Sequence, residues 1–281
     1  MSAQTLLLNW LKPRLAPESL AWLEEKAALL ATGAPEKTVS LAFSMALRYS
    51  GKAPLALDAA ALKAARTEVP GWNPSDWTCD DAARVFLLLS LPPGTASSGI
   101  MDRLYQTADV AEAAALQKAV AVLAFPEGHL ARAREALRSN IKAVFEAITL
   151  RNPYPALNFD NVGWNQMVVK TFFVESPVHE IEGLDRRVNP PLSRMLSDLA
   201  EERWAAGRAF SPQLWRCVGP CADSRGLDNL KKALAQGAPA EKRAAVLALQ
   251  SCPDPQAALI LQAEPALAAA AREGTLTWEN L

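Results

Sequence analysis

The chain has 281 residues, 50% of them hydrophobic, which is enough to bury the core of one large domain or two small ones and excludes intrinsic disorder. A net charge of −1 gives no basic face that would favour nucleic acid or anionic lipid as the main partner. No segment approaches the roughly 20 uninterrupted apolar residues of a membrane span, and the N-terminus shows no signal-peptide pattern, so we expect a cytoplasmic protein.

The first part of the chain is predicted to form helices that begin at proline and end at glycine. A short amphipathic helix over Leu6–Leu15 ends or kinks at Pro13. A second helix runs over residues 17–33 and a third over residues 35–50, each with proline at its start and glycine at its end. Asp58 is placed to cap a fourth helix, which Pro70 stops.

A helix that begins after Thr78 is predicted to lie at the centre of the N-terminal half. Thr78 and Asp81 resemble a capping box, with aspartate in place of the usual glutamate. The following residues through Leu89 are apolar on most sides, as in a fully buried helix. Further helices are expected near residues 100–108, 110–123 and 126–150, the last being the longest.

The C-terminal third has the pattern of a helical repeat. After a strong helix over Pro191–Ala206, a series of helix pairs begins at Pro212. The string APAEKRAAVLALQSCPDPQAALIL resembles a HEAT-type repeat, and such pairs stack because neither helix buries its apolar face alone. No long β-alternation occurs. We therefore predict an all-α fold, a right-handed α-α superhelix with HEAT-like repeats around an irregular, loop-rich junction.

The predicted organisation has three parts within one continuous domain. They are an N-terminal helical half (residues 1–150), a central polar junction with its helix (151–209) and the HEAT-like repeats (210–281).

The junction is where the sequence departs most from a packed helical core, over Arg151–Arg187. Flat aromatic surfaces and neutral amides occur together there, a mixture typical of binding pockets. The candidate ligand-binding residues are Asn152, Tyr154, Trp164, Asn165, Lys170, His179, Asp185, Arg186 and Arg187.

His179 is the candidate for chemistry in this stretch. Glu180, Glu182 and Asp185 follow it closely, and imidazole beside carboxylates serves as a general acid or base or as a metal ligand. The other interpretation is a loop residue hydrogen-bonded to its surroundings. Because the chain has only 2 histidines, a multi-histidine metal site would need carboxylates to complete it, and we predict no metal.

The basic residues of the junction also have two interpretations. The guanidinium groups of Arg186 and Arg187 could hold a carboxylate or phosphate, or form internal ion pairs with nearby helix carboxylates. Lys170 could be a Schiff-base lysine, but a lysine on an amphipathic helix is far more often solvated or ion-paired.

Other reactive side chains favour structural interpretations. His129, early in a predicted helix, is expected to be a surface or capping residue. Cys217 and Cys221 have CxxxC spacing rather than the CxxC of zinc ribbons and redox enzymes, and small buried side chains are the simpler interpretation. The sequence contains no GxSxG, GxxxxGK[ST], GxGxxG or HExxH motif, so no cofactor is predicted.

Several long strings of the chain resemble the EboA family, the EboA domain-containing metabolite traffic proteins of bacteria. The most specific are GKAPLAL at 51–57, NPYP at 152–155, WNQMVVKTFF at 164–173, SPVHEIEGLDRRVNP at 176–190, ERWAAGR at 202–208 and PQLWRCVGP at 212–220, with LTWENL at the end. The resemblance implies membership of a gene cluster that moves a small metabolite or its precursor towards the periplasm. It also implies partners from that cluster, including a prenyltransferase-like membrane protein, and it supplies no catalytic residues.

Three functions agree with these observations. The first is a non-catalytic helical-repeat module that binds partner proteins or the metabolite, which the missing catalytic motifs favour. The second is an enzyme acting on a small aromatic or terpenoid-like metabolite, with His179 as acid or base. The third is a carrier that shields an apolar metabolite between helices, near residues such as Tyr154, Trp164 and Phe173.

Overall fold

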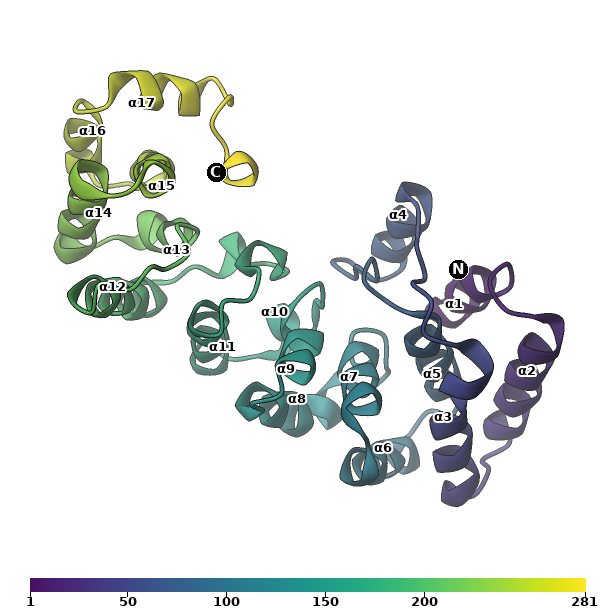
Figure 1. The fold of residues 1–281 in the computed structure, drawn as a ribbon. Coiled ribbons are helices and arrows are strands. Elements are labelled where there is room, and N and C mark those ends of the chain that lie inside the picture. Colours follow the sequence, from purple (N-terminus) through teal and green to yellow (C-terminus); the bar gives the residue numbers. More distant parts are fainter. The chain divides into compact units, whose positions relative to one another are not determined.

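The computed structural model describes residues 1–281, apart from the side chains of residues 95–98. The described chain contains 17 α-helices and no β-strand, which confirms the predicted all-α class (Figure 1). None of its helices combines the length and the apolar character that crossing a membrane requires.

The helices divide into two compact units, residues 1–160 and 161–281, called here the N-terminal and C-terminal units. The predicted three-part organisation stays a prediction. The N-terminal unit contains α1 (Ala3–Leu11), α2 (Pro17–Ala31), α3 (Glu36–Ser50), α4 (Ala59–Glu68), α5 (Cys79–Leu89), α6 (Thr95–Thr107), α7 (Val110–Ala119), the 3₁₀ helix η1 (Pro126–His129), α8 (Leu130–Arg138), α9 (Lys142–Thr149) and α10 (Tyr154–Asn158).

The C-terminal unit also consists of α-helices and short 3₁₀ helices. It contains α11 (Asn161–Phe173), η2 (Val178–Glu180), η3 (Asp185–Arg187), α12 (Pro190–Ala205), α13 (Leu214–Val218), η4 (Gly219–Cys221), α14 (Ser224–Gln236), α15 (Pro239–Ser251), α16 (Pro255–Leu261), α17 (Pro265–Arg272) and η5 (Trp278–Asn280).

Helix α5 is the centre of the N-terminal unit, as its apolar sequence predicts. Residues 79–88 are all buried, and α1, α2, α3 and α7 pack around them (Figure 1). The predicted capping box is present, with Thr78 and Asp81 exchanging side-chain and backbone hydrogen bonds at the start of the helix. The helix also buries an ion pair, in which Arg84 donates to Asp80 over 2.5 Å.

The predicted single helix over residues 126–150 is wrong, because this segment consists of η1, α8 and α9. Ser139 takes an extended conformation at the end of α8. Its hydroxyl oxygen accepts a hydrogen bond from the backbone N–H of Ile141 over 3.1 Å, so the side chain competes with the helical backbone pattern. The resulting break lets α9 pack against both α7 and α8.

The C-terminal unit has its own core around α12, α13 and α15. The rings of Trp204, Phe210 and Trp215 pack together with centroid distances of 5.5 to 5.9 Å. Gly219 follows α13 and rests directly on α15, where a Cβ atom would lie 2.3 Å from the backbone oxygen of Ala248. Helices α14 to α16 pack against one another, while their HEAT-like character stays a prediction.

Candidate functional site

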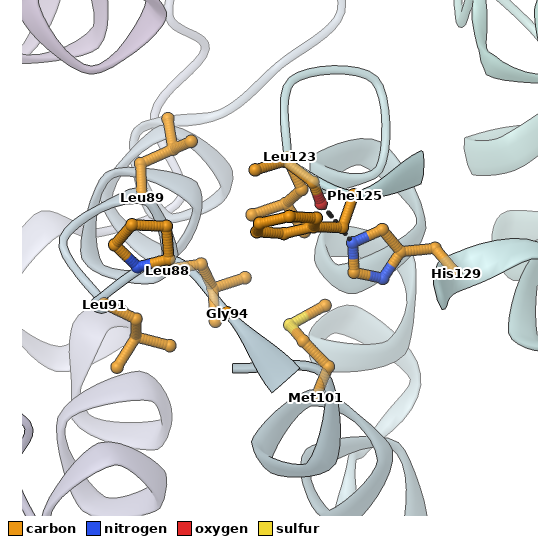
Figure 2. Close-up of a pocket in the computed structure, with 10 residues that line it drawn as sticks. Leu88, Leu89, Leu91, Gly94, Met101, Leu123, Phe125 and His129 are labelled. Atoms are coloured by element: carbon orange, nitrogen blue, oxygen red, sulfur yellow. Dashed lines mark hydrogen bonds between the residues drawn. The ribbon is translucent and has the colours of Figure 1, made fainter. Parts of the chain in front are cut away.

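An apolar pocket of about 240 Å³ opens in the N-terminal unit (Figure 2). The end of α5, the segment that follows it, α6 and the residues around η1 supply its walls. We call it the apolar pocket, and its lining residues are Leu88, Leu89, Leu91, Pro93, Gly94, Met101, Leu123, Ala124, Phe125 and His129.

The sequence produces this pocket where the buried helix α5 ends. Ser90 closes α5 by donating to the Phe86 carbonyl over 2.9 Å and accepting from Gln4 over 2.8 Å. Beyond it, Pro93 and Gly94 turn the chain, and Gly94 has a φ of 140°, which favours glycine. The chain therefore leaves α5 and reaches α6 with an apolar surface left open between them.

The opposite wall of the pocket carries His129, whose imidazole faces the leucines at the end of α5 (Figure 2). His129 is 6% exposed, and its Nε2 lies 3.0 Å from the backbone oxygen of Ala124. A carbonyl oxygen only accepts, so this contact requires a proton on Nε2. The expected surface position of His129 is wrong, because η1 turns the ring into the protein. His129 does occupy the N-cap position of α8, but its side chain makes no capping hydrogen bond.

Phe125 forms the exposed rim of the pocket. It has a left-handed backbone (φ 56°, ψ 61°), and its side chain is 48% exposed. A non-glycine residue holds this conformation only when its surroundings enforce it, and such residues cluster at functional sites. The pocket thus combines apolar walls, one oriented imidazole and an aromatic rim, which suits binding of an apolar small molecule.

Two of the sequence-predicted site residues belong to the same unit and have protein partners. The Asn152 side chain donates to the backbone oxygens of Gln117 and Ala147, both over 3.1 Å. The buried Tyr154 hydroxyl donates to the backbone oxygen of Pro126. These bonds fix α7 and the start of η1. Burial raises the pKa of Tyr154 to about 12, so the hydroxyl keeps the proton it donates.

In the C-terminal unit, the structure brings Trp164 and Arg187 together. Trp164 is completely buried, and the Arg187 guanidinium lies 4.6 Å from its ring centroid, in cation–π range. Arg187 also donates to the Asn161 side chain over 3.1 Å.

Asn165 instead pairs with Asn189. Each amide donates to the other, over 3.0 and 2.8 Å, and Asn189 caps α12 by accepting from the Leu192 N–H over 3.0 Å. This amide pair therefore connects α11 to the start of α12.

The remaining basic and acidic candidates form ion pairs or lie partly in solvent. Asp185 accepts two hydrogen bonds of 2.6 Å from Arg216, a bidentate pair. Arg186 is exposed and pairs with Glu182 over 2.7 Å. Lys170 is half-buried, and burial lowers its pKa. Arg186 thus has an ion pair at the surface, whereas Arg187 contacts a ring and an amide. Both interpretations of these arginines, and ligand binding by the candidate residues, stay predictions.

His179 lies exposed on an open groove of about 510 Å³ in the C-terminal unit. Glu175, Ser176 and Phe210 line the same groove. The groove gives His179 access to solvent and to any bound molecule, so the enzymatic interpretation stays a prediction.

Sequence reasoning missed the apolar pocket because nothing marks its residues as a group. Leu88 and Met101 read as ordinary core positions, and His129 is separated from them by most of α6 and α7. The one available signal is the apolar run of residues 119–125, which continues past the end of α7 and then meets Pro126 and a histidine.

Comparison with known proteins agrees with the resemblance of the sequence strings. The family model described as "Metabolite traffic protein EboA" matches residues 3–219. No curated protein and no solved structure matches the chain. The match covers the N-terminal unit from residue 3 onward, including the apolar pocket, and all of the predicted junction. The chain belongs to the EboA family of metabolite traffic proteins.

Proposed function

We propose that the protein acts in metabolite traffic as a non-catalytic binding protein that holds an apolar small molecule in the apolar pocket. The observation that carries this proposal is the pocket itself, about 240 Å³ with walls of leucine, methionine and phenylalanine. A dry apolar cavity of roughly 150 Å³ is sufficient to bind benzene. The pocket is therefore large enough for one aromatic or short aliphatic group.

The chemistry of the walls supports binding rather than turnover. Among the lining residues that the structure describes, the one ionisable side chain is His129, whose Nε2 is directed to a backbone carbonyl. A nucleophile activated by this histidine would have to lie within hydrogen-bond reach, and the described lining residues include no serine, cysteine or carboxylate.

The role in traffic includes delivery, which we also propose. The protein would act in the cytoplasm and pass its ligand to other products of the same gene cluster, including the prenyltransferase-like membrane protein. The direction of this traffic, towards the periplasm, comes from the family resemblance. The HEAT-like helices of residues 210–281 are the proposed surface for such partners.

The pocket is tested with fluorobenzene, a probe small enough for its volume, by ¹⁹F NMR line broadening. Ala124 is exposed at the pocket wall, so Ala124→Leu fills the pocket without replacing a core residue. Ala131, exposed on α8 and outside the pocket, provides the matched control Ala131→Leu.

We expect the wild type and Ala131→Leu to broaden the fluorobenzene signal. Ala124→Leu should broaden it much less or not at all. Equal broadening by all three proteins, or none by the wild type, contradicts the proposed site. Native mass spectrometry of the protein after incubation with cell extract then identifies the natural ligand.

A further inference from the structure

A second pocket in the N-terminal unit, with a more polar lining than the apolar pocket, is formed by residues of α6, α7, α8 and α9 and of the segment between α8 and α9. Its volume is about 390 Å³. We call it the polar pocket, and it is lined by Tyr105, Ala113, Gln117, Arg132, Glu135, Ala136, Arg138, Ser139, Ile141 and Val144. The break at Ser139 that divides α8 from α9 contributes to its wall, so the pocket exists because this segment is not one helix.

The polar pocket contains a buried amide with an unused acceptor. Gln117 is 2% exposed, and its Nε2 donates to the backbone oxygen of Arg132 over 3.4 Å. Its Oε1 has no hydrogen-bond partner among the described residues. The amide cannot be turned round, because its oxygen cannot donate to the Arg132 carbonyl. The orphaned atom is therefore an acceptor that requires a donor.

Tyr105 supplies a second unused group. Its hydroxyl is buried and also lacks a partner among the described residues. Burial raises the pKa of Tyr105 well above its ordinary value, so the phenol stays neutral and able to donate. A buried polar group without a partner is destabilising, and a ligand that supplies the partner recovers that cost.

The charges around the pocket favour a neutral ligand. Arg132 donates to Asp102 over 2.8 Å and to Glu135 over 2.7 Å. Arg138 also lines the pocket, so two arginines and two carboxylates leave no net charge around it. A carboxylate placed at the floor of the pocket would face the Gln117 oxygen, which also accepts and would repel it. A hydroxyl group fits better, since it both donates and accepts.

We propose that the polar pocket binds a neutral small molecule that carries a hydroxyl group on an apolar ring or chain. The ligand hydroxyl donates to Gln117 Oε1 and accepts from the Tyr105 hydroxyl, and the ring packs on apolar side chains of Ala113, Ala136, Ile141 and Val144. Both protein atoms are buried, so the proposed contact requires the Tyr105 and Gln117 side chains to rotate towards the pocket. This site is separate from the apolar pocket and does not depend on it.

The experiment compares 4-fluorophenol with fluorobenzene, two probes that differ by one hydroxyl, using ¹⁹F NMR titration. It is carried out in the wild type and in the Ala124→Leu protein, where the apolar pocket is filled. Tyr105→Phe removes only the hydroxyl and keeps the ring. Gln117→Met removes the acceptor at similar volume, and circular dichroism with thermal unfolding confirms that each variant is folded.

We expect 4-fluorophenol to bind in the Ala124→Leu background and fluorobenzene not to bind there. Tyr105→Phe should weaken 4-fluorophenol binding by about 2- to 12-fold, the range of one hydrogen bond, and a folded Gln117→Met should do the same. The proposal is overturned if a folded Tyr105→Phe protein binds 4-fluorophenol as tightly as its parent. It is also overturned if Ala124→Leu abolishes the binding of 4-fluorophenol together with that of fluorobenzene. Failure of the apolar pocket appears separately, as unchanged fluorobenzene binding in Ala124→Leu.

Discussion

In the N-terminal unit, the buried ion pair between Arg84 and Asp80 of α5 is the clearest case in which one side chain determines stability. Arg84 is 1% exposed, and its guanidinium contacts Asp80, the Phe43 backbone oxygen and, at 5.5 Å from the centroid, the Phe43 ring. The pair fixes α3 against α5. Each charge of the pair compensates the other. This matters because an uncompensated buried charge costs far more free energy than an exposed one.

Asp80→Ala should therefore lower the free energy of unfolding by about 3–5 kcal/mol, the cost of breaking a buried pair. The measurement is urea unfolding followed by circular dichroism. Glu182→Ala is the matched control, since Glu182 and Arg186 form an i,i+4 pair at the surface and its loss should cost less than about 1 kcal/mol. Similar losses in the two variants would show that burial does not govern the pair.

Glu241 in α15 should make the free energy of unfolding depend on pH. The sign of this dependence is opposite to that of a carboxylate in an ordinary ion pair. Burial is the largest influence on its pKa and raises it. The folded state therefore holds the proton to higher pH than the unfolded state, and stability falls as pH rises from the unfolded pKa through the folded pKa. Above the folded-state pKa, the buried ionised carboxylate costs free energy of folding.

Glu241→Gln should accordingly be more stable than the wild type at pH 7, because the amide carries no charge to desolvate. The difference should shrink as pH falls through the carboxyl range, which urea unfolding at a series of pH values measures. Glu201 is the contrasting control: hydrogen bonds from Arg225 and Asn229 lower its pKa, so Glu201→Gln should destabilise at pH 7. A Glu241→Gln protein less stable at pH 7 would refute the assignment.

At the scale of elements, the close approach of η4 to α15 is the strictest packing constraint in the C-terminal unit. A side chain at Gly219 meets backbone rather than a flexible side chain, so one helix has to move. Gly226, inside α14, is different: its added Cβ would lie 3.1 Å from the Ala222 Cβ, a tight but adjustable contact.

Gly219→Ala should cost at least about 1–3 kcal/mol, the range for overpacking a core. Gly226→Ala should lie near neutral, because the gain of up to about 1 kcal/mol from replacing glycine within a helix offsets the tight contact. Thermal unfolding of the Gly219→Ala and Gly226→Ala proteins tests both predictions. A Gly219→Ala protein as stable as the wild type would mean that η4 and α15 are not in this contact.

The sequence predicts most elements because their starts and ends depend on local chemistry. The prolines that open α2, α15 and α16 and the capping box of α5 act within a few residues of their own position. The division of residues 126–150 into three helices was not predictable in this way. Ser139 is compatible with a helix interior, and the packing of α9 against α7 and α8 favours its alternative hydrogen bond.

The candidate sites depend on longer-range contacts and were correspondingly harder to predict. A mixture of amides and aromatics indicates polar burial but does not say whether the partner is a ligand or the protein. Asn152 and Asn165 both have protein partners. The two pockets, by contrast, form between helices whose facing residues are unremarkable in the sequence.

At the scale of the whole molecule, both pockets belong to the N-terminal unit, whose core is internal to residues 1–160. We therefore expect residues 1–160 expressed alone to fold and to broaden the fluorobenzene signal as the full chain does. Circular dichroism and ¹⁹F NMR provide the measurement, with Ala124→Leu in the short chain as control. A helical short chain without fluorobenzene binding would show that the apolar pocket needs residues beyond 160.

Gly219 is also the last residue that the family model matches, although it rests on a helix outside the matched region. The three atoms nearest to a Cβ added at this position all belong to the backbone of Ala248, so α15 is the helix that a side chain there would meet. A relative that lacks a counterpart of α15 is free of this restriction and can carry a larger residue at the equivalent site. The residue at this position thus reports whether a relative has kept the C-terminal helices.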